Sequence, residues 1–173
     1  MKTPHTVAAL LREIRARPDL QEQIRGLLLA GESAPNVCDA PAQAYKIVRP
    51  YLLGGTVERL VAVALDRRNR VLGAQILTQG SDACTVVDPR QIFRWALLQG
   101  RSGANAIILA HNHPSGDSAP SRQDIEVTLR VAAAGRVVGV NLLDHLIVTD
   151  TTYTSLADQG HVPSGPGPAA YHT

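Results

Sequence analysis

The chain of 173 residues contains few cysteines and few aromatic side chains. Its two cysteines, Cys38 and Cys84, lie far apart and form no C-x-x-C pair, which excludes a cysteine-based zinc ribbon and gives no disulfide framework. Aromatic residues make up only 3% of the chain, so no stacking platform for single-stranded nucleic acid stands out. These features favour a reducing, cytoplasmic location.

The sequence also lacks a strong excess of charge and a long apolar run. Its formal net charge is +2, so composition does not support DNA as a partner, although it does not exclude DNA. The first twenty residues carry charges at every turn, which fits neither a secretory signal nor a membrane anchor. With 45% hydrophobic residues, we expect a soluble protein with one sizeable core and no membrane partner.

The hydrophobic pattern alternates between the periods of helices and strands. It predicts an α/β fold in which a mixed β-sheet is flanked by helices. We expect an N-terminal helical segment over residues 1–40, a domain over 41–160 and a Gly/Pro-rich disordered tail over 161–173. The expected helices cover residues 6–18, 18–31, 41–55, 88–100 and 121–139, and the expected strands cover 59–66, 71–80, 104–111 and 140–150.

The second expected strand carries a polar residue on a face that is otherwise apolar. Side chains alternate along a strand, so Val71, Gly73, Gln75 and Leu77 should share one face. A glutamine at this position requires an explanation beyond core packing.

The stretch "AHNHPSGDSAPSRQD", residues 110–124, is the strongest candidate for a chemical site. Strand alternation places His111 and His113 on the same face, with Asn112 pointing away. The Gly/Pro loop that follows leads into a helix whose first turn contains Asp124, and a short loop can return that carboxylate to the histidines. Two imidazoles and one carboxylate suit Zn²⁺ and leave a fourth position open, the pattern of catalytic sites.

A purely structural interpretation of these residues is also available. Ser121-x-x-Asp124 matches a helix capping box, with the acidic residue favoured by the helix dipole. A histidine at the end of a strand is usually a hydrogen-bonded core residue. The spacing therefore favours a metal site without excluding a structural role.

The motif H-x-H-x(7)-S-x-x-D resembles the signature of the JAMM (MPN+, JAB) zinc metalloprotease domain. The blocks "HNHPSG", "DPRQI" and "LLDHLIV" resemble the RadC branch of that family, over about residues 41–160. The resemblance implies a JAB/MPN-type, cytidine-deaminase-like architecture and one zinc ion per chain, held by His111, His113 and Asp124. It further implies hydrolysis of a peptide or isopeptide bond, with Ser121 holding the water or the tetrahedral intermediate.

In this family a glutamate on a neighbouring strand deprotonates the water at the metal. Counting back five residues from Gly80 places Gln75 at the expected position. An amide can hold a water but cannot take its proton, so general-base catalysis, worth about 10²–10⁴-fold, would be weakened. Asp82 and Asp117 are substitute candidates, although both also read as turn residues. His145 is expected either behind the ligands or simply buried and hydrogen-bonded.

Three functions remain in competition. The first is a zinc metallohydrolase of the JAMM type that cleaves a peptide, isopeptide or related amide. The second is a RadC-like metal-binding or interaction module with weakened catalysis, for which Gln75 is the argument; a link to DNA repair is part of this alternative. The third, a nuclease, has only the letters "HNH" and the basic hairpin tip of Arg67, Arg68 and Arg70 in its favour, and such a cluster is usually just solvated. The substrate is not specified by the sequence.

Overall fold

The computed structural model describes residues 35–80 and 87–163. The two helices expected before residue 35 lie outside the described residues, as do Asp82, Cys84 and the tail from residue 164.

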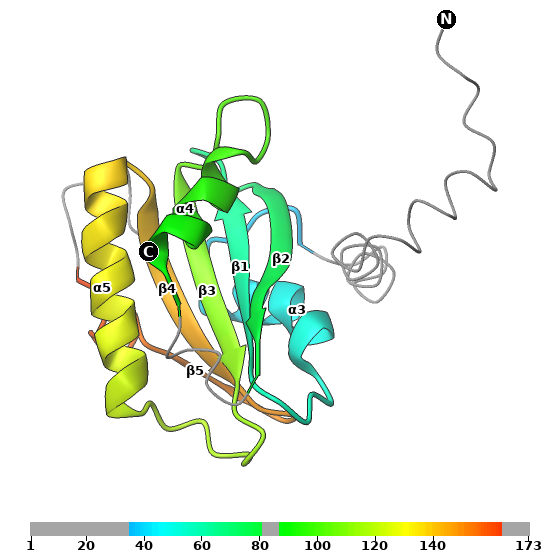
Figure 1. Ribbon diagram of the computed structural model, residues 1–173. Coiled ribbons are helices and arrows are strands. Elements are labelled where there is room, and N and C mark those ends of the chain that lie inside the picture. The colour runs from blue at the N-terminus through cyan, green and yellow to red at the C-terminus, as the bar shows by residue number, and fades with distance from the viewer. Residues whose placement is uncertain (1–34, 81–86, 164–173) are drawn as a thin grey trace, which may run out of the picture.

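The described part of the chain contains five strands and three helices (Figure 1). This confirms the predicted α/β fold with a mixed sheet flanked by helices, and adds the short strand β5, which the sequence pattern does not reveal. In chain order the elements are α3 (Pro41–Leu52), β1 (Arg59–Leu65), β2 (Val71–Gln79), α4 (Pro89–Leu97), β3 (Ala106–Asn112), α5 (Arg122–Val138), β4 (Asn141–Val148) and β5 (Tyr153–Ser155).

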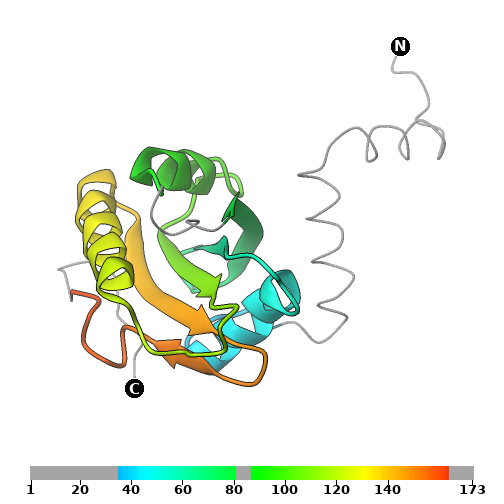
Figure 2. The ribbon, with the colours of Figure 1, turned by 60° about the horizontal axis from the view of Figure 1, so that its bottom comes forward.

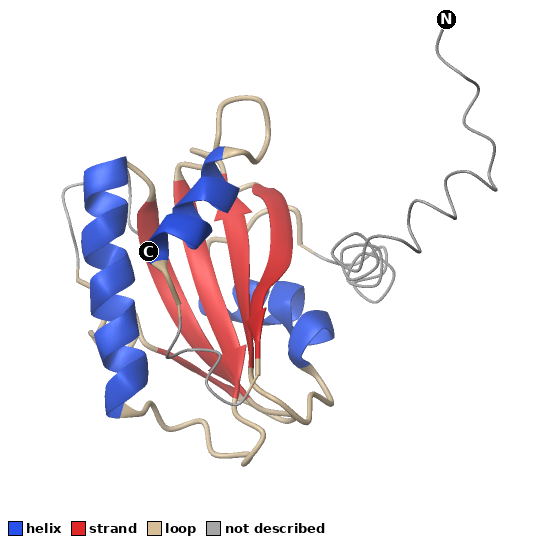
Figure 3. Ribbon diagram, viewed as in Figure 1, coloured by secondary structure: helices blue, strands red, loops and turns tan. Residues whose placement is uncertain are grey.

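The strands form one sheet in the order β2-β1-β3-β4-β5. Only β3 and β4 are parallel, and α5 supplies the crossover that a parallel pair requires. Helices α4 and α5 cover one face of the sheet and α3 covers the other, as Figures 2 and 3 show. Because β1 runs antiparallel to β3, the start of β1 lies beside the end of β3.

Two apolar clusters fill the spaces between these layers. The cluster under α4 and α5 includes Leu60, Ile107 and Leu109, whereas the cluster under α3 includes Val61 and Ile108. Strands β1 and β3 therefore contribute alternate residues to both clusters, and their side chains are buried on both faces. This confirms the interpretation of residues 59–66 as a strand covered on both sides.

The predicted face of β2 needs one correction. The register between β1 and β2 shifts next to Leu65, a β-bulge that adds a residue to β2. As a result, Val71 packs against the α3 cluster, while Leu72 and Leu77 pack against the other cluster. The simple period of two predicts Val71 and Leu77 on one face. Because of the bulge, they lie on opposite faces.

Both ends of the long helix α5 follow the expected sequence signals. Ser121 caps the N-terminus, and Gly139 ends the helix in the left-handed conformation with φ 81°.

At the start of the predicted tail, the His161 N–H donates to the Leu156 carbonyl and Val162 packs against the core. Within the described residues, no helix is long and apolar enough to cross a membrane.

Candidate metal centre

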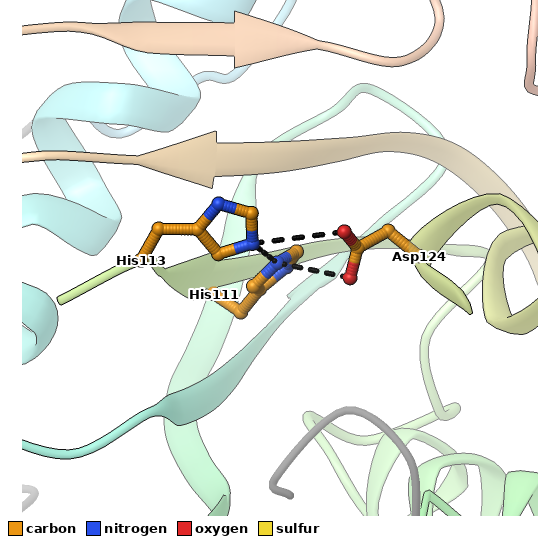
Figure 4. A group of neighbouring side chains, drawn as sticks. All are labelled: His111, His113 and Asp124. Atoms are coloured by element: carbon orange, nitrogen blue, oxygen red, sulfur yellow. Dashed lines mark hydrogen bonds and ion pairs between the residues drawn. The ribbon is translucent and has the colours of Figure 1, made fainter. Parts of the chain in front are cut away.

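The three predicted metal ligands meet at the end of β3, beside the start of α5 (Figure 4). His111 is the next-to-last residue of β3, and His113 directly follows the strand, so both rings project to the same side. Asp124 stands three residues after the cap of α5 and points back at the two rings. His111 and Asp124 are buried, whereas the His113 side chain is 15% exposed.

The facing atoms of these residues lie close together. His111 Nε2 is 2.9 Å from His113 Nε2. Asp124 Oδ1 is 3.1 Å from His111 Nε2, and Asp124 Oδ2 is 3.6 Å from His113 Nε2. The three side chains thus present one group of nitrogen and oxygen atoms to a common point.

A buried hydrogen-bond chain determines which nitrogen of His111 carries the proton. The Thr128 hydroxyl donates its hydrogen to the Asp124 carbonyl at 2.6 Å, so in its 2.7 Å contact with His145 Nδ1 it can only accept. His145 Nδ1 therefore donates, and neutral His145 accepts at Nε2 from His111 Nδ1 at 2.9 Å. It follows that His111 Nε2 carries a lone pair.

The second histidine is oriented in the same way by a backbone group. His113 Nδ1 lies 2.7 Å from the carbonyl oxygen of Asp117, which can only accept a hydrogen bond. His113 Nε2 is therefore also left with a lone pair when the ring is neutral. Two imidazole lone pairs and a carboxylate then face one another, an arrangement that repels itself unless a proton or a metal cation lies between them.

The dimensions of the cluster suit a small metal ion in tetrahedral coordination. Ligand atoms at the corners of a tetrahedron around Zn²⁺, with bonds of about 2.1 Å, are about 3.4 Å apart. The two histidine nitrogens are 2.9 Å apart, and the distances to Asp124 are 3.1 Å from His111 to Oδ1 and 3.6 Å from His113 to Oδ2, so these separations bracket this value. Both rings are also held through Nδ1, the arrangement typical of metal-binding histidines. The residues present therefore fit a divalent metal ion.

The capping box and the candidate metal site use the same carboxylate. Ser121 accepts from the Asp124 N–H, and Asp124 Oδ2 accepts from both the Ser121 N–H at 2.8 Å and the Ser121 hydroxyl at 2.6 Å. Oδ1 remains turned toward His111. The structural interpretation and the metal interpretation of this motif are thus not alternatives, because the cap orients the carboxylate toward the histidines.

The electrostatics of the site favour an anionic Asp124 and a neutral His145. Burial alone raises the pKa of Asp124, but in the metal-free protein the hydrogen bonds that protonated His111 and His113 donate from Nε2 outweigh it and lower the pKa far below its usual range. The hydrogen bond to Asp124 raises the pKa of His113 despite partial burial. Complete burial, followed by the neighbouring His111, lowers the pKa of His145 well below its usual value.

A cleft of about 530 Å³ opens beside two of the candidate ligands, His113 and Asp124. His113, Ser121 and Asp124 line it, and so does Glu58, which immediately precedes β1. The antiparallel register pairs Leu60 with His111, so Glu58 comes level with His113. The negative charge of Glu58 also contributes to the raised pKa of His113. A carboxylate therefore stands beside the candidate metal centre.

The structure does not bring Gln75 into this group. Gln75 pairs with Ala62 on the edge strand β2, and Ala62 in turn pairs with Leu109, two residues before His111. Strand spacing and rise then place its Cα about 12 Å from that of His111. Gln75 is also absent from the residues that line the cleft.

The remaining residues singled out in the sequence lie around the three ligands or away from them. The Asp117 carboxylate accepts from the Ala119 N–H, as a turn residue does, and its carbonyl orients His113. His145 lies behind His111 and is at once buried and hydrogen-bonded. In the basic hairpin tip, Arg70 pairs with Asp66 at 2.7 Å. Sequence reasoning missed Glu58; the signal available was a carboxylate directly before the apolar strand predicted from residue 59.

Comparison with known proteins agrees with this geometry. The sequence profile of the RadC-like JAB domain matches residues 38–161. A UPF0758 protein of Methanosarcina acetivorans is 36% identical over 131 residues, which are 76% of this chain and 56% of that protein. A UPF0758 protein of Symbiobacterium thermophilum is 38% identical over 69% of this chain and 50% of its own length. A UPF0758 protein of Halalkalibacterium halodurans is 46% identical over 61% of this chain and 44% of its own length.

The chain spans about half the length of these relatives. The profile match covers most of the chain, and it includes all three candidate ligands, Ser121 and Glu58. The chain therefore belongs to the family of RadC-like JAB domains.

Proposed function

We propose that this protein is a zinc-dependent hydrolase that cleaves a peptide, isopeptide or related amide bond. The observation that carries the proposal is the convergence of three electron-pair donors, His111, His113 and Asp124, beside a cleft that also contains a second carboxylate, Glu58. A structural metal site would be closed by four protein ligands, whereas the described residues offer three here, beside an open cleft.

Each residue of the site has a chemical role in this proposal. His111, His113 and Asp124 would hold the zinc ion, which supplies a Lewis acid that polarises the amide carbonyl and acidifies a coordinated water. Glu58 would take the proton from the attacking water and pass it to the nitrogen of the leaving amine as the C–N bond breaks. Ser121 keeps Asp124 in place through two hydrogen bonds and lines the cleft where the carbonyl oxygen would lie.

Glu58 bears directly on the alternative of an interaction module with weakened catalysis. That alternative depended on Gln75 standing at the position of the general base. With Glu58 level with His113 and in the same cleft, Gln75 is no longer needed in that role. A catalytic function is therefore favoured over a purely binding one, and no feature of the described residues specifically favours DNA as the substrate.

The proposal is tested by turnover of a panel of fluorogenic peptide and isopeptide substrates. We expect the zinc-loaded protein to cleave at least one member, a chelator to abolish cleavage, and added zinc to restore it. Glu58→Gln should retain its zinc and lose about 10²–10⁴-fold in turnover, since an amide cannot accept the proton. Arg122→Ala is the matched control, because its ion pair with Glu126 lies on the exposed face of α5.

Two results would contradict the proposal. Turnover that survives chelation would show that the chemistry does not need the metal. Equal turnover in wild type and Glu58→Gln, at equal zinc content, would show that Glu58 is not the base.

A further inference from the structure

Asn112 lies between the two histidines in sequence, and its side chain is nearly fully buried on the opposite side of β3. Its amide makes two hydrogen bonds to the segment that precedes β1. The Arg59 N–H donates to Asn112 Oδ1 at 2.8 Å, and Asn112 Nδ2 donates to the Val57 carbonyl at 3.1 Å. Because one partner is a donor and the other an acceptor, only this orientation of the amide satisfies both.

These two bonds hold the peptide groups on either side of Glu58. The Val57 carbonyl belongs to the peptide that precedes Glu58, and the Arg59 N–H belongs to the peptide that follows it. The backbone has only two soft dihedrals per residue, and each of the two peptide groups sets one of them for Glu58. A single side chain thus restrains both φ and ψ of the residue proposed as the base.

Besides Asn112, the end of β2 also holds the peptide group that follows Glu58, next to the pairing of Arg59 with Gln79. Glu58 lies before the first residue of β1, outside the ladder between β1 and β3. Its carbonyl accepts one hydrogen bond, from the N–H of Gly80 at the end of β2. On the far side of the Asn112 amide lies Gly55, where a Cβ would come within 3.1 Å of Nδ2 and 3.3 Å of the Val57 carbonyl. A side chain at position 55 would therefore press on the Asn112 amide.

We propose that Asn112 is a positioning residue that holds Glu58 beside the metal centre and couples its place to the strand that carries His111 and His113. The inference rests on the proposed function, because it takes Glu58 as the base. A flexible segment could not keep a carboxylate at a fixed distance from the reacting water, and misplacement by about 1 Å costs an enzyme up to 10²-fold. Asn112 restricts that freedom through its hydrogen bonds to the backbone on both sides of Glu58.

The test compares wild type, Asn112→Ala, Glu58→Gln, the double variant and the control Ser155→Ala. Ser155 also makes a buried side-chain hydrogen bond, to Asp144 at 2.7 Å, but on the α3 side of the sheet and away from the cleft. Zinc affinity is measured first, by competition with a chromophoric chelator. Asn112→Ala should keep the zinc affinity of the wild type. By contrast, a metal ligand that loses its supporting partner loses about 10–100-fold in affinity.

The decisive readout needs no substrate. The visible absorption of the Co²⁺-loaded proteins is titrated against pH, which reports ionisation next to the metal. Glu58→Gln removes a negative charge from this region, so the midpoint should move to lower pH. Asn112→Ala should move the midpoint in the same direction, and the double variant should move no further than Glu58→Gln, because residues that act as a unit are not additive. Ser155→Ala should keep the wild-type midpoint.

The outcomes separate this inference from the proposed function. A shift in Glu58→Gln with a wild-type midpoint in Asn112→Ala would overturn the role of Asn112 and leave Glu58 as the base. No shift in either variant would show that Glu58 does not face the metal, which overturns both. If Asn112→Ala does not fold, Gly55→Ala presses on the same amide from the other side and should shift the midpoint in the same direction; a wild-type midpoint there would overturn the role.

Discussion

Thr128→Val tests whether the buried chain from Thr128 through His145 fixes the tautomer of His111. Valine has nearly the shape of threonine, so the substitution removes the hydroxyl and little else. In the native protein this hydroxyl accepts the proton of His145 Nδ1 at 2.7 Å, and both residues are fully buried. Without it, either the N–H of His145 stays unpaired or the ring changes tautomer and no longer accepts from His111 Nδ1.

Both consequences have a measurable size. An unpaired buried donor costs about 1–3 kcal/mol, which would lower the free energy of unfolding of the metal-free protein. A ligating histidine that loses its outer partner typically loses about 10–100-fold in metal affinity, or about 1.4–2.7 kcal/mol. Urea unfolding of the metal-free protein measures the first effect, and competition with a chelator for zinc measures the second.

Thr149→Val provides the matched control. Thr149 is also a buried threonine, and its hydroxyl is hydrogen-bonded to the Thr152 backbone rather than to a histidine. We expect this variant to lose stability and to keep its zinc affinity. If Thr128→Val loses stability to the same degree and also binds zinc like the wild type, the chain does not set the tautomer of His111 and the reasoning is refuted.

Two further predictions concern pH and the edge strand. The raised pKa of His113 means that its interaction with Asp124 stabilises the metal-free fold below the usual imidazole value of 6.5, and that this stabilisation is lost as pH rises through the raised folded pKa. Thermal melts of metal-free wild type and His113→Gln between about pH 6 and pH 9 should therefore converge at the alkaline end, and a constant gap would contradict the assignment. Gln75→Glu should leave zinc content and turnover unchanged because residue 75 is distant from His111. A large gain in turnover would show instead that residue 75 on β2 is at the position of the general base.

The local parts of the site could be predicted from the sequence. The strand period places His111 and His113 on one face, and the capping signal places Asp124 in the first turn of α5, because both patterns depend only on neighbours along the chain. The order of helices and strands was predictable for the same reason. The three-residue strand β5 was not, since it is too short to show a period.

The base could not be placed from local patterns because it depends on the order of the strands. Counting along the hairpin led to Gln75 on β2, as if β2 lay next to the histidines. In the sheet, β1 separates β2 from β3, so the start of β1, with Glu58, reaches the end of β3. The roles of Thr128 and Asn112 could not be predicted either. Their hydrogen-bond partners are 17 residues away for Thr128 and 53–55 residues away for Asn112.

Elemental analysis of the purified protein tests the central claim most directly. Wild type and His113→Ala are dialysed against the same zinc-containing buffer, freed of unbound metal and analysed in parallel. We predict about one zinc ion per chain in wild type and a large loss in His113→Ala, because only two of the three protein ligands remain. Equal zinc content in the two proteins would contradict the assignment of His111, His113 and Asp124 as the metal site.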